Sequence, residues 1–252
     1  MLKNITLYVE ADYQAMSKKA AEIFAGAVKA NPMGAYGFAT GASPEGMYEE
    51  LIRMHKNGEV DLSGIRGFNL DEYHPILQND PNSYYTYMRE HLYDAVGIPP
   101  GNTFIPNGEA KDPLLECELY EAKLRGSGGI DIQILGIGTN GHIGFNEPAE
   151  SLSPTTTYLP LAKETIEVNS INFGVSGDIP RHALTMGIHS IMMAKRIILL
   201  ASGAKKAEIM HKALCGPITT NVPASLLQLH RDVVVITDSQ AGSLLKLKDS
   251  SQ

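Results

Sequence analysis

Residues 130–147 read IDIQILGIGTNGHIGFNE, an apolar run that changes at Gly136 into a polar loop rich in glycine. A short apolar run that ends at glycine is typical of a buried strand. In parallel sheets, ligands bind outside the carboxyl ends of the strands. The stretch therefore predicts a buried strand of an α/β protein, followed by a loop that belongs to a ligand site.

On both sides of this stretch, short β-rich runs alternate with longer segments of helical period. With 252 residues, 43% of them apolar, the chain has the size of one large α/β domain. We expect a single domain over residues 1–252, with an open, mainly parallel, Rossmann-like sheet and helices on both faces. The predicted strands are Ile5–Val9, Tyr36–Ala39, Ile65–Leu70, Ile130–Leu135, Arg196–Leu200 and Val233–Thr237. The predicted helices are Tyr13–Ala30, Pro44–Met54, Ser83–Val96, Pro113–Leu124, Pro180–Met192 and Lys205–Ala213.

Composition argues against several classes of partner. The net charge is -7 and the chain has no Lys/Arg-rich run, so nucleic acid is not an expected partner. The longest apolar runs, such as Ile197–Ala201, are far shorter than a membrane span, and no signal peptide is evident at the start. We therefore expect a cytoplasmic protein without membrane contact. Cys117 and Cys215 lie far apart in sequence and are expected to be free, buried thiols.

Four polar segments follow predicted strands: Thr40–Pro44, Asp71–His74, Gly136–Glu147 and Ser202–Lys206. Because the carboxyl ends of parallel strands share one edge of the sheet, these segments can converge on one cleft.

The segment Thr40–Pro44 is made of small residues between a predicted strand and a predicted helix. Its backbone N–H groups and two hydroxyls would face an anion such as phosphate at the helix N-terminus. A simple Thr/Ser helix cap explains the same residues, so both interpretations remain open. The segment lacks the Gly-Lys-Ser/Thr ending of a P-loop.

Asp71 and Glu72 come directly after an apolar strand, where a carboxylate could act as a general base towards a substrate carbon. A solvated acidic turn is the alternative, because acidic residues are mostly exposed. His74 raises the question of a metal site, but three possible ligands within four residues do not form one without a second set elsewhere. No metal is predicted.

The stretch Gly136–Gly141 formally matches the dinucleotide motif G-x-G-x-x-G. That motif should begin a long helix, whereas Gly144 and Pro148 interrupt the sequence that follows, and residues 153–156 read SPTT where an acidic residue is expected. A dinucleotide cofactor is therefore not predicted. Instead, Asn140, His142 and Glu147 bring an amide, an imidazole and a carboxylate into one loop, a set suited to proton transfer near neutral pH.

Taken together, these segments resemble the glucosamine-6-phosphate deaminase/isomerase family along nearly the whole chain. The most specific piece is Leu135–Pro148, with the sequence LGIGTNGHIGFNEP. Supporting pieces are Ala39–Gly46 (ATGASPEG), Asn69–Tyr73 (NLDEY), Pro81–Tyr84 (PNSY), Ala183–Gly187 (ALTMG) and Pro223–His230 (PASLLQLH).

The resemblance implies a reaction without metal or organic cofactor, in which an amino-sugar 6-phosphate opens, a proton moves between C2 and C1, and ammonia leaves. It implies that Asp71 is the base and that His142 opens the ring, with Asn140 and Glu147 holding and polarising that histidine. The family carries Asp or Asn at the position of Asn140. The substrate-binding residues that we expect are Thr40, Gly41, Ala42, Ser43, Glu72, Gly136, Gly138 and Lys206, with Thr40–Ser43 and Lys206 on the phosphate.

The chain departs from the family pattern where phosphate-binding arginines are expected, since Thr155, Ile166 and Ile171 occupy these positions. Isoleucine offers no phosphate contact. Three explanations stay open: the galactosamine isomer as substrate, another cation such as Lys163 or Arg181 on the phosphate, or a more distant substrate.

Residues 149–178 are either an active-site lid or a long connection. Thr157, Leu159 and Pro160 replace the basic and hydroxyl groups of the allosteric site known in some relatives, so that regulation is not expected.

Two further functions and the state of assembly also stay open. 6-Phosphogluconolactonases typically read Asp-Glu-Arg where this chain has Asp71-Glu72-Tyr73, and Thr-Ala-Ser-Leu-Phe after Gly-His. A non-catalytic sugar-phosphate sensor is the other alternative. The chain is either a monomer or a homo-oligomer.

Overall fold

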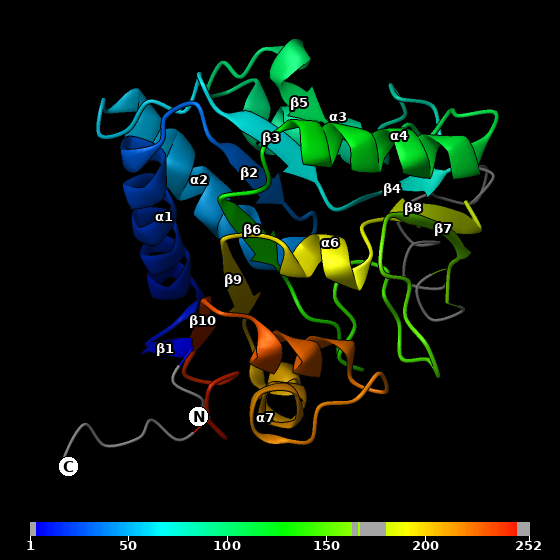
Figure 1. Cartoon of the computed structure of the whole chain (residues 1–252). Helices are drawn as coiled ribbons and strands as arrows, with labels where there is room; N and C mark the ends of the chain where they lie inside the picture. Colours follow the sequence, from blue (N-terminus) through cyan, green and yellow to red (C-terminus); the bar gives the residue numbers. More distant parts are fainter. Residues whose placement is uncertain (1–3, 163–165, 167–179, 246–252) are drawn as a thin grey trace.

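A computed structural model of the chain describes residues 4–162, 166 and 180–245 (Figure 1). Within these residues, seven strands form a fully parallel sheet in the order β1-β10-β9-β6-β2-β3-β5. The prediction of a mainly parallel sheet is confirmed. The strands are β1 (Ile5–Glu10), β2 (Ala35–Phe38), β3 (Arg66–Asn69), β5 (Thr103–Phe104), β6 (Ile132–Leu135), β9 (Arg196–Ala201) and β10 (Val233–Asp238).

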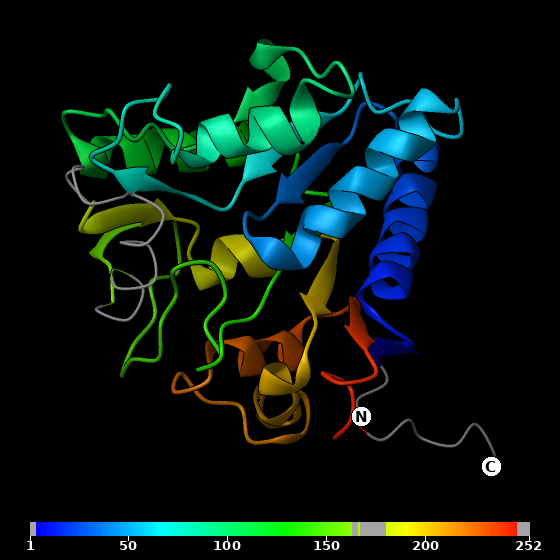
Figure 2. The same ribbon diagram turned by 180° about the vertical axis from the view of Figure 1, so that it is seen from behind.

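Helices cover both faces of this sheet (Figures 1 and 2). In β9, Ile198 and Leu200 pack towards one face, whereas Ile197 and Leu199 pack towards the other, as the alternation of a strand requires. The first face carries α1 (Tyr13–Ala30), α2 (Ala42–Lys56), α3 (Tyr84–Met88) and the π-helical η1 (Arg89–Tyr93). The second face carries α4 (Pro113–Gly126), α6 (Ile188–Met192), α7 (Ala207–Cys215) and the 3-10 helix η4 (Pro223–Leu229). Two further 3-10 turns are η2 (Pro100–Asn102) and η3 (Ala204–Lys206).

Local sequence explains where the helices begin. Asp12 caps α1, because its Oδ1 accepts a hydrogen bond of 2.8 Å from the N–H of Ala15. Asp112 caps α4 in the same way, and Pro113 occupies its first turn. The helix predicted from Pro44 begins earlier, at Ala42, with Gly41 as its N-cap. None of the helices in the described ranges has the length and apolar character that a membrane crossing requires.

A second, antiparallel sheet was not predicted. It has the order β4-β8-β7 and consists of β4 (Asp71–His74), β8 (His182–Thr185) and β7 (Thr157–Pro160). In Figure 1 it lies at the end of the molecule away from α1. The prediction of a helix over Pro180–Met192 was wrong: residues 182–185 are a strand, and only Ile188–Met192 is helical. The expectation that both thiols are buried was wrong for Cys215, which is free but exposed.

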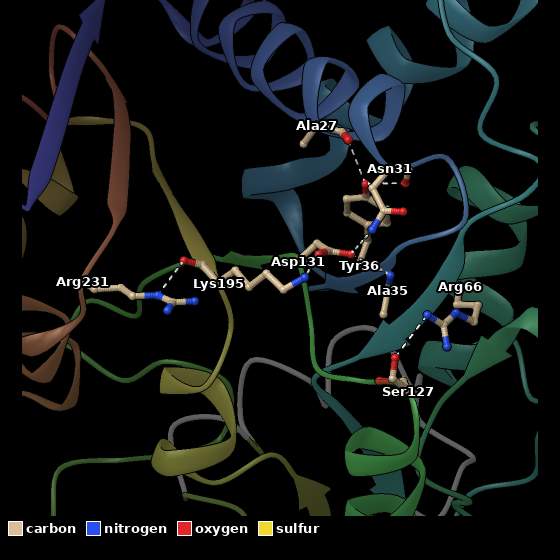
Figure 3. Close-up of polar contacts among 9 residues, drawn as sticks. All are labelled: Ala27, Asn31, Ala35, Tyr36, Arg66, Ser127, Asp131, Lys195 and Arg231. Atoms are coloured by element: carbon tan, nitrogen blue, oxygen red, sulfur yellow. Dashed lines mark hydrogen bonds and ion pairs between the residues drawn. The ribbon is translucent and has the colours of Figure 1, made fainter.

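The amino-terminal edge of the parallel sheet is held by Asp131, which directly precedes β6 (Figure 3). Its Oδ2 accepts hydrogen bonds from Asn31 Nδ2 at 2.9 Å and from the N–H of Ala35 at 3.1 Å. Its Oδ1 lies 2.6 Å from Lys195 Nζ. These contacts join the beginnings of β2, β6 and β9 and leave the opposite edge of the sheet for the site.

Candidate active site

The polar segments predicted to form a cleft follow four neighbouring strands, β9, β6, β2 and β3. Contacts between the segments confirm that they meet. A Cβ built on Gly136 would lie 3.7 Å from Ser43 Oγ, so the loop after β6 passes beside the loop after β2. Lys206, after β9, donates a hydrogen bond of 2.6 Å from Nζ to the carbonyl of Ile137. Asp71 begins β4, one residue beyond the end of β3.

The loop after β2 leads directly into α2. Gly41 has a φ of 99° and a ψ of 173°, a conformation open to glycine and strained for other residues. The first N–H groups of α2 have no partner within the helix, and Gly41 and Ala42 are exposed. The positive end of the helix dipole therefore faces the same space as free N–H donors, which suits an anion.

Lys206 supplies a cation beside this loop. It ends the turn η3, which follows Gly203, a residue with a φ of 89°. Burial lowers the pKa of its ammonium group from the usual value. An anion bound next to Lys206 would stabilise the charged form and oppose that shift.

His142, Glu147 and Asn140 form a cluster within the loop after β6. His142 Nδ1 lies 3.1 Å from Glu147 Oε1, close but not well aligned for a hydrogen bond. Asn140 Nδ2 donates to Glu147 Oε2 at 2.6 Å, and Asn140 Oδ1 accepts from the N–H of His142 at 3.1 Å. The imidazole lies over Gly138, where a Cβ would come within 2.3 Å of the ring. The cluster therefore holds a half-exposed imidazole against a carboxylate, as proton transfer requires.

Asp71 lies across the same loop and is almost completely buried, with 6% of its surface exposed. Burial, and then the charge of Glu72, raise the pKa of its carboxyl to about 8. A Cβ on Gly144 would lie 3.4 Å from Asp71 Oδ2 and 3.0 Å from Thr185 Oγ1, so the loop passes directly beside the carboxylate. The loop after β6 thus passes beside Asp71 at Gly144. The same loop carries His142, two residues before Gly144.

Glu72 is separated from this set, because neighbouring residues of a strand point to opposite faces. Its Oε1 accepts hydrogen bonds of 2.9 Å from the N–H groups of Tyr73 and Tyr84, and its Oε2 accepts one of 3.0 Å from Tyr85. Burial raises its pKa to about 7, although these three hydrogen bonds lower it. It also lines a cavity of 340 Å³. This geometry favours an anchoring role at the start of α3 over the predicted substrate contact.

Two residues near Asp71 were missed as site residues from the sequence. Thr185 pairs with Asp71 across β4 and β8, and its Oγ1 accepts a hydrogen bond of 3.2 Å from the N–H of Phe145. Tyr84 lies partly buried near Asp71, and its ring stacks parallel to Phe145 at 6.2 Å. The motifs Ala183–Gly187 and Pro81–Tyr84 contained both residues, but only the folded chain brings them close to Asp71.

The structure describes only some of the residues named in connection with the missing arginines. Ile171 and Lys163, and much of the segment 149–178, lie outside the described residues. Ile166 packs against the small core of Tyr73 and Phe145, and Arg181 is exposed directly before β8. Thr157, Leu159 and Pro160 lie in β7.

The sequence of the chain matches a known family and is similar to individual members of it. Residues 10–236 match the family model of glucosamine-6-phosphate isomerases/6-phosphogluconolactonase. The chain is 50% identical to a glucosamine-6-phosphate deaminase of Alkaliphilus oremlandii over 239 residues, which are 95% of this chain and 99% of that protein. It is also 50% identical to a glucosamine-6-phosphate deaminase of Halothermothrix orenii over 237 residues, 94% of this chain and 98% of that protein.

Two solved structures also resemble this chain, one of a deaminase and one of a lactonase. A monomeric glucosamine-6-phosphate deaminase superimposes with a TM-score of 0.90 and 43% identity, covering 96% of this chain and 99% of that one. A 6-phosphogluconolactonase from Trypanosoma brucei reaches a TM-score of 0.72 at 20% identity, covering 96% and 98% of the two chains. At that identity, the second likeness shows a common fold alone.

Proposed function

Because the chain belongs to the family of glucosamine-6-phosphate isomerases and 6-phosphogluconolactonases, we propose that it converts glucosamine 6-phosphate and water into fructose 6-phosphate and ammonia. The observation that carries this proposal is the position of the buried Asp71 beside Gly144 of the loop that holds His142. Asp71 and His142 are thus two acid–base groups beside the same loop. A reaction with two separate proton transfers needs two such groups.

In this mechanism His142, polarised by Glu147, assists the opening of the sugar ring by moving a proton at the ring oxygen. Asp71 then removes the proton from C2 and returns it to C1. Carbon C2 reaches the oxidation level of a ketone, and water replaces the amino group there as ammonia leaves. Each positioned proton transfer typically contributes ~10²–10⁴ in rate.

The phosphate is bound at the start of α2 by N–H groups and hydroxyls of Thr40–Ser43, and Lys206 contributes a positive charge. Two facts support this part of the proposal: Ser43 lies beside Gly136, and Lys206 is hydrogen-bonded to Ile137 of the same loop. The carbon chain of the sugar would then extend from the start of α2 towards Asp71 and His142.

Contacts around Tyr73 favour a deaminase over a lactonase. Tyr73 stands where lactonases typically have arginine, and Phe145 lies in the stretch where they read Thr-Ala-Ser-Leu-Phe. The two rings pack together with centroids 5.7 Å apart, and Tyr84 contacts both. An arginine at Tyr73 would introduce a charge into this small apolar core.

The epimer of the substrate and the location of the reaction complete the proposal. We take glucosamine 6-phosphate as the main substrate because the relatives at 50% identity are named for it, with galactosamine 6-phosphate as the alternative. We place the reaction in the cytoplasm, as composition predicts.

The direct test measures ammonia release by the purified chain with glucosamine 6-phosphate and galactosamine 6-phosphate side by side. The ketose phosphate formed is identified in each case. We expect turnover with glucosamine 6-phosphate and less with the galactosamine isomer. If folded protein releases no ammonia from either sugar but hydrolyses 6-phosphogluconolactone, the deaminase assignment is wrong.

A further inference from the structure

Tyr13, the first residue of α1, reaches into the first turn of α2. Its hydroxyl donates a hydrogen bond of 2.7 Å to the carbonyl of Ala42 and accepts one of 2.8 Å from the N–H of Gly46. In an α-helix these two groups, four residues apart, bond to each other. The phenol of Tyr13 therefore sits at the hydrogen bond that defines the start of α2.

This contact fixes the orientation of the peptide unit between Ala42 and Ser43. A trans peptide is planar, and its carbonyl and N–H point in opposite directions. Because the hydroxyl of Tyr13 binds the carbonyl of Ala42, the N–H of Ser43 in the same peptide points away from Tyr13, and the side chain of Ser43 lies beside Gly136.

The phenol of Tyr87 also lies at this loop, but it has a side-chain acceptor besides the loop backbone. The hydroxyl of Tyr87 lies 3.2 Å from the carbonyl of Gly41 and 3.0 Å from Glu45 Oε1. A phenol has one hydrogen to donate, and the carboxylate is the stronger acceptor. Both hydrogen-bond partners of Tyr13 are backbone groups, so Tyr13 is the better candidate for fixing the orientation of the loop.

The packing of α1 on α2 is shaped to admit the ring of Tyr13. A Cβ on Gly46 would lie 2.9 Å from Tyr13 Cε1 and 2.5 Å from Ser17 Oγ. A larger residue at position 46 would displace the ring. Gly46 and Tyr13 thus form a matched pair across the two helices.

We propose that Tyr13 is a positioning residue for the phosphate group of the substrate, acting through the peptide between Ala42 and Ser43. This inference rests on the proposed function, because it takes the loop Thr40–Ser43 as the phosphate site. Tyr13 itself touches no substrate, and it orients an N–H donor that does.

The test is the Tyr13→Phe variant, which keeps the ring and removes the hydroxyl. We expect KM for glucosamine 6-phosphate and the inhibition constant of inorganic phosphate to rise by the same factor, roughly 3- to 10-fold for one hydrogen bond. The value of kcat should stay within about twofold, since the groups around C1 and C2 are unchanged. Tyr8→Phe, on β1, is the control and should change neither constant.

The Gly46→Ala variant, which crowds the ring from α2, provides a second measurement and should raise both constants as well. Unchanged KM and unchanged phosphate inhibition in folded Tyr13→Phe would overturn the proposal, whatever happens to its melting temperature. A fall in kcat alone would overturn it too. Direct calorimetry of inorganic phosphate on both proteins keeps the test separate from deaminase activity, because it needs no turnover.

Discussion

Asp71 and Glu72 are adjacent carboxyl groups with different surroundings. Both are buried, but three backbone N–H groups bind the Glu72 carboxylate, whereas Asp71 faces the loop that carries His142. Burial and the neighbouring charge of Glu72 raise the pKa of Asp71 to about 8. The base that we propose Asp71 to be works only when ionised, so kcat/KM should fall as the pH drops below about 8.

At the residue scale we predict that Glu72→Gln moves this acid limb to lower pH. Removing the neighbouring negative charge lowers the pKa of Asp71, and the expected shift is roughly one pH unit. The measurement is kcat/KM from pH 5.5 to 9. Glu109→Gln, on the same cavity but on its exposed rim, is the matched control. An unmoved limb in Glu72→Gln would contradict the electrostatic coupling, even if the rate falls.

At the scale of elements, Asp238 at the end of β10 holds the loop after β9. Its Oδ2 accepts hydrogen bonds from Ser202 Oγ at 2.6 Å and from the N–H of Gly203 at 2.9 Å. Burial alone would raise the pKa of Asp238, but these bonds and one from the N–H of Ala241 lower it overall. Its stabilising contribution is therefore present above the unfolded pKa and is lost as the pH falls.

We predict that Asp238→Asn loosens the turn that carries Lys206. The amide has a single acceptor oxygen, so it cannot accept from Ser202 and Gly203 on one side and from the N–H of Ala241 on the other, and KM should rise roughly 3- to 10-fold with kcat retained. Asp232→Asn is the matched control, because Asp232 pairs with Arg196 at the opposite ends of the same two strands. Steady-state kinetics distinguish the two variants. Equal KM changes in both would indicate a general loss of strand packing instead.

The elements also show what the sequence predicts well. Six of the seven parallel strands in the described residues were found within one or two residues, because runs such as residues 233–236 are apolar at every position, whereas the two-residue strand β5 was missed. The antiparallel sheet was missed for two reasons. The segment Asp71–His74 is polar and resembles a turn, and its partner His182–Thr185 is four residues long and more than one hundred positions away. Only the pairing between them makes either one a strand.

At the scale of the whole molecule, the sequence placed the four polar segments at one edge of the sheet. This worked because the direction of parallel strands follows from the alternation of strands and helices. The side-chain directions could not be predicted in the same way. Glu72 was predicted to bind the substrate, and the sequence did not reveal that its carboxylate accepts hydrogen bonds from Tyr84 and Tyr85 at the N-terminus of α3.

The stability of the whole fold also depends on Asp71. Burial raises its folded pKa from the ordinary value of 3.8 to about 8, so its contribution to stability is fully present below pH 3.8 and is lost as the pH rises through about 8. Asparagine has no charge to bury. The Asp71→Asn variant should therefore fold, and its melting temperature relative to the parent chain should be higher at pH 8 than at pH 5.

The most direct test of the central claim compares the parent chain with Asp71→Asn at pH 8. Ammonia release from glucosamine 6-phosphate and calorimetric binding of the same sugar phosphate are measured on both proteins. We predict that Asp71→Asn loses at least about 10²-fold in turnover, as removal of a general base does, while it binds with similar affinity. Turnover of the variant at the rate of the parent chain would contradict the account.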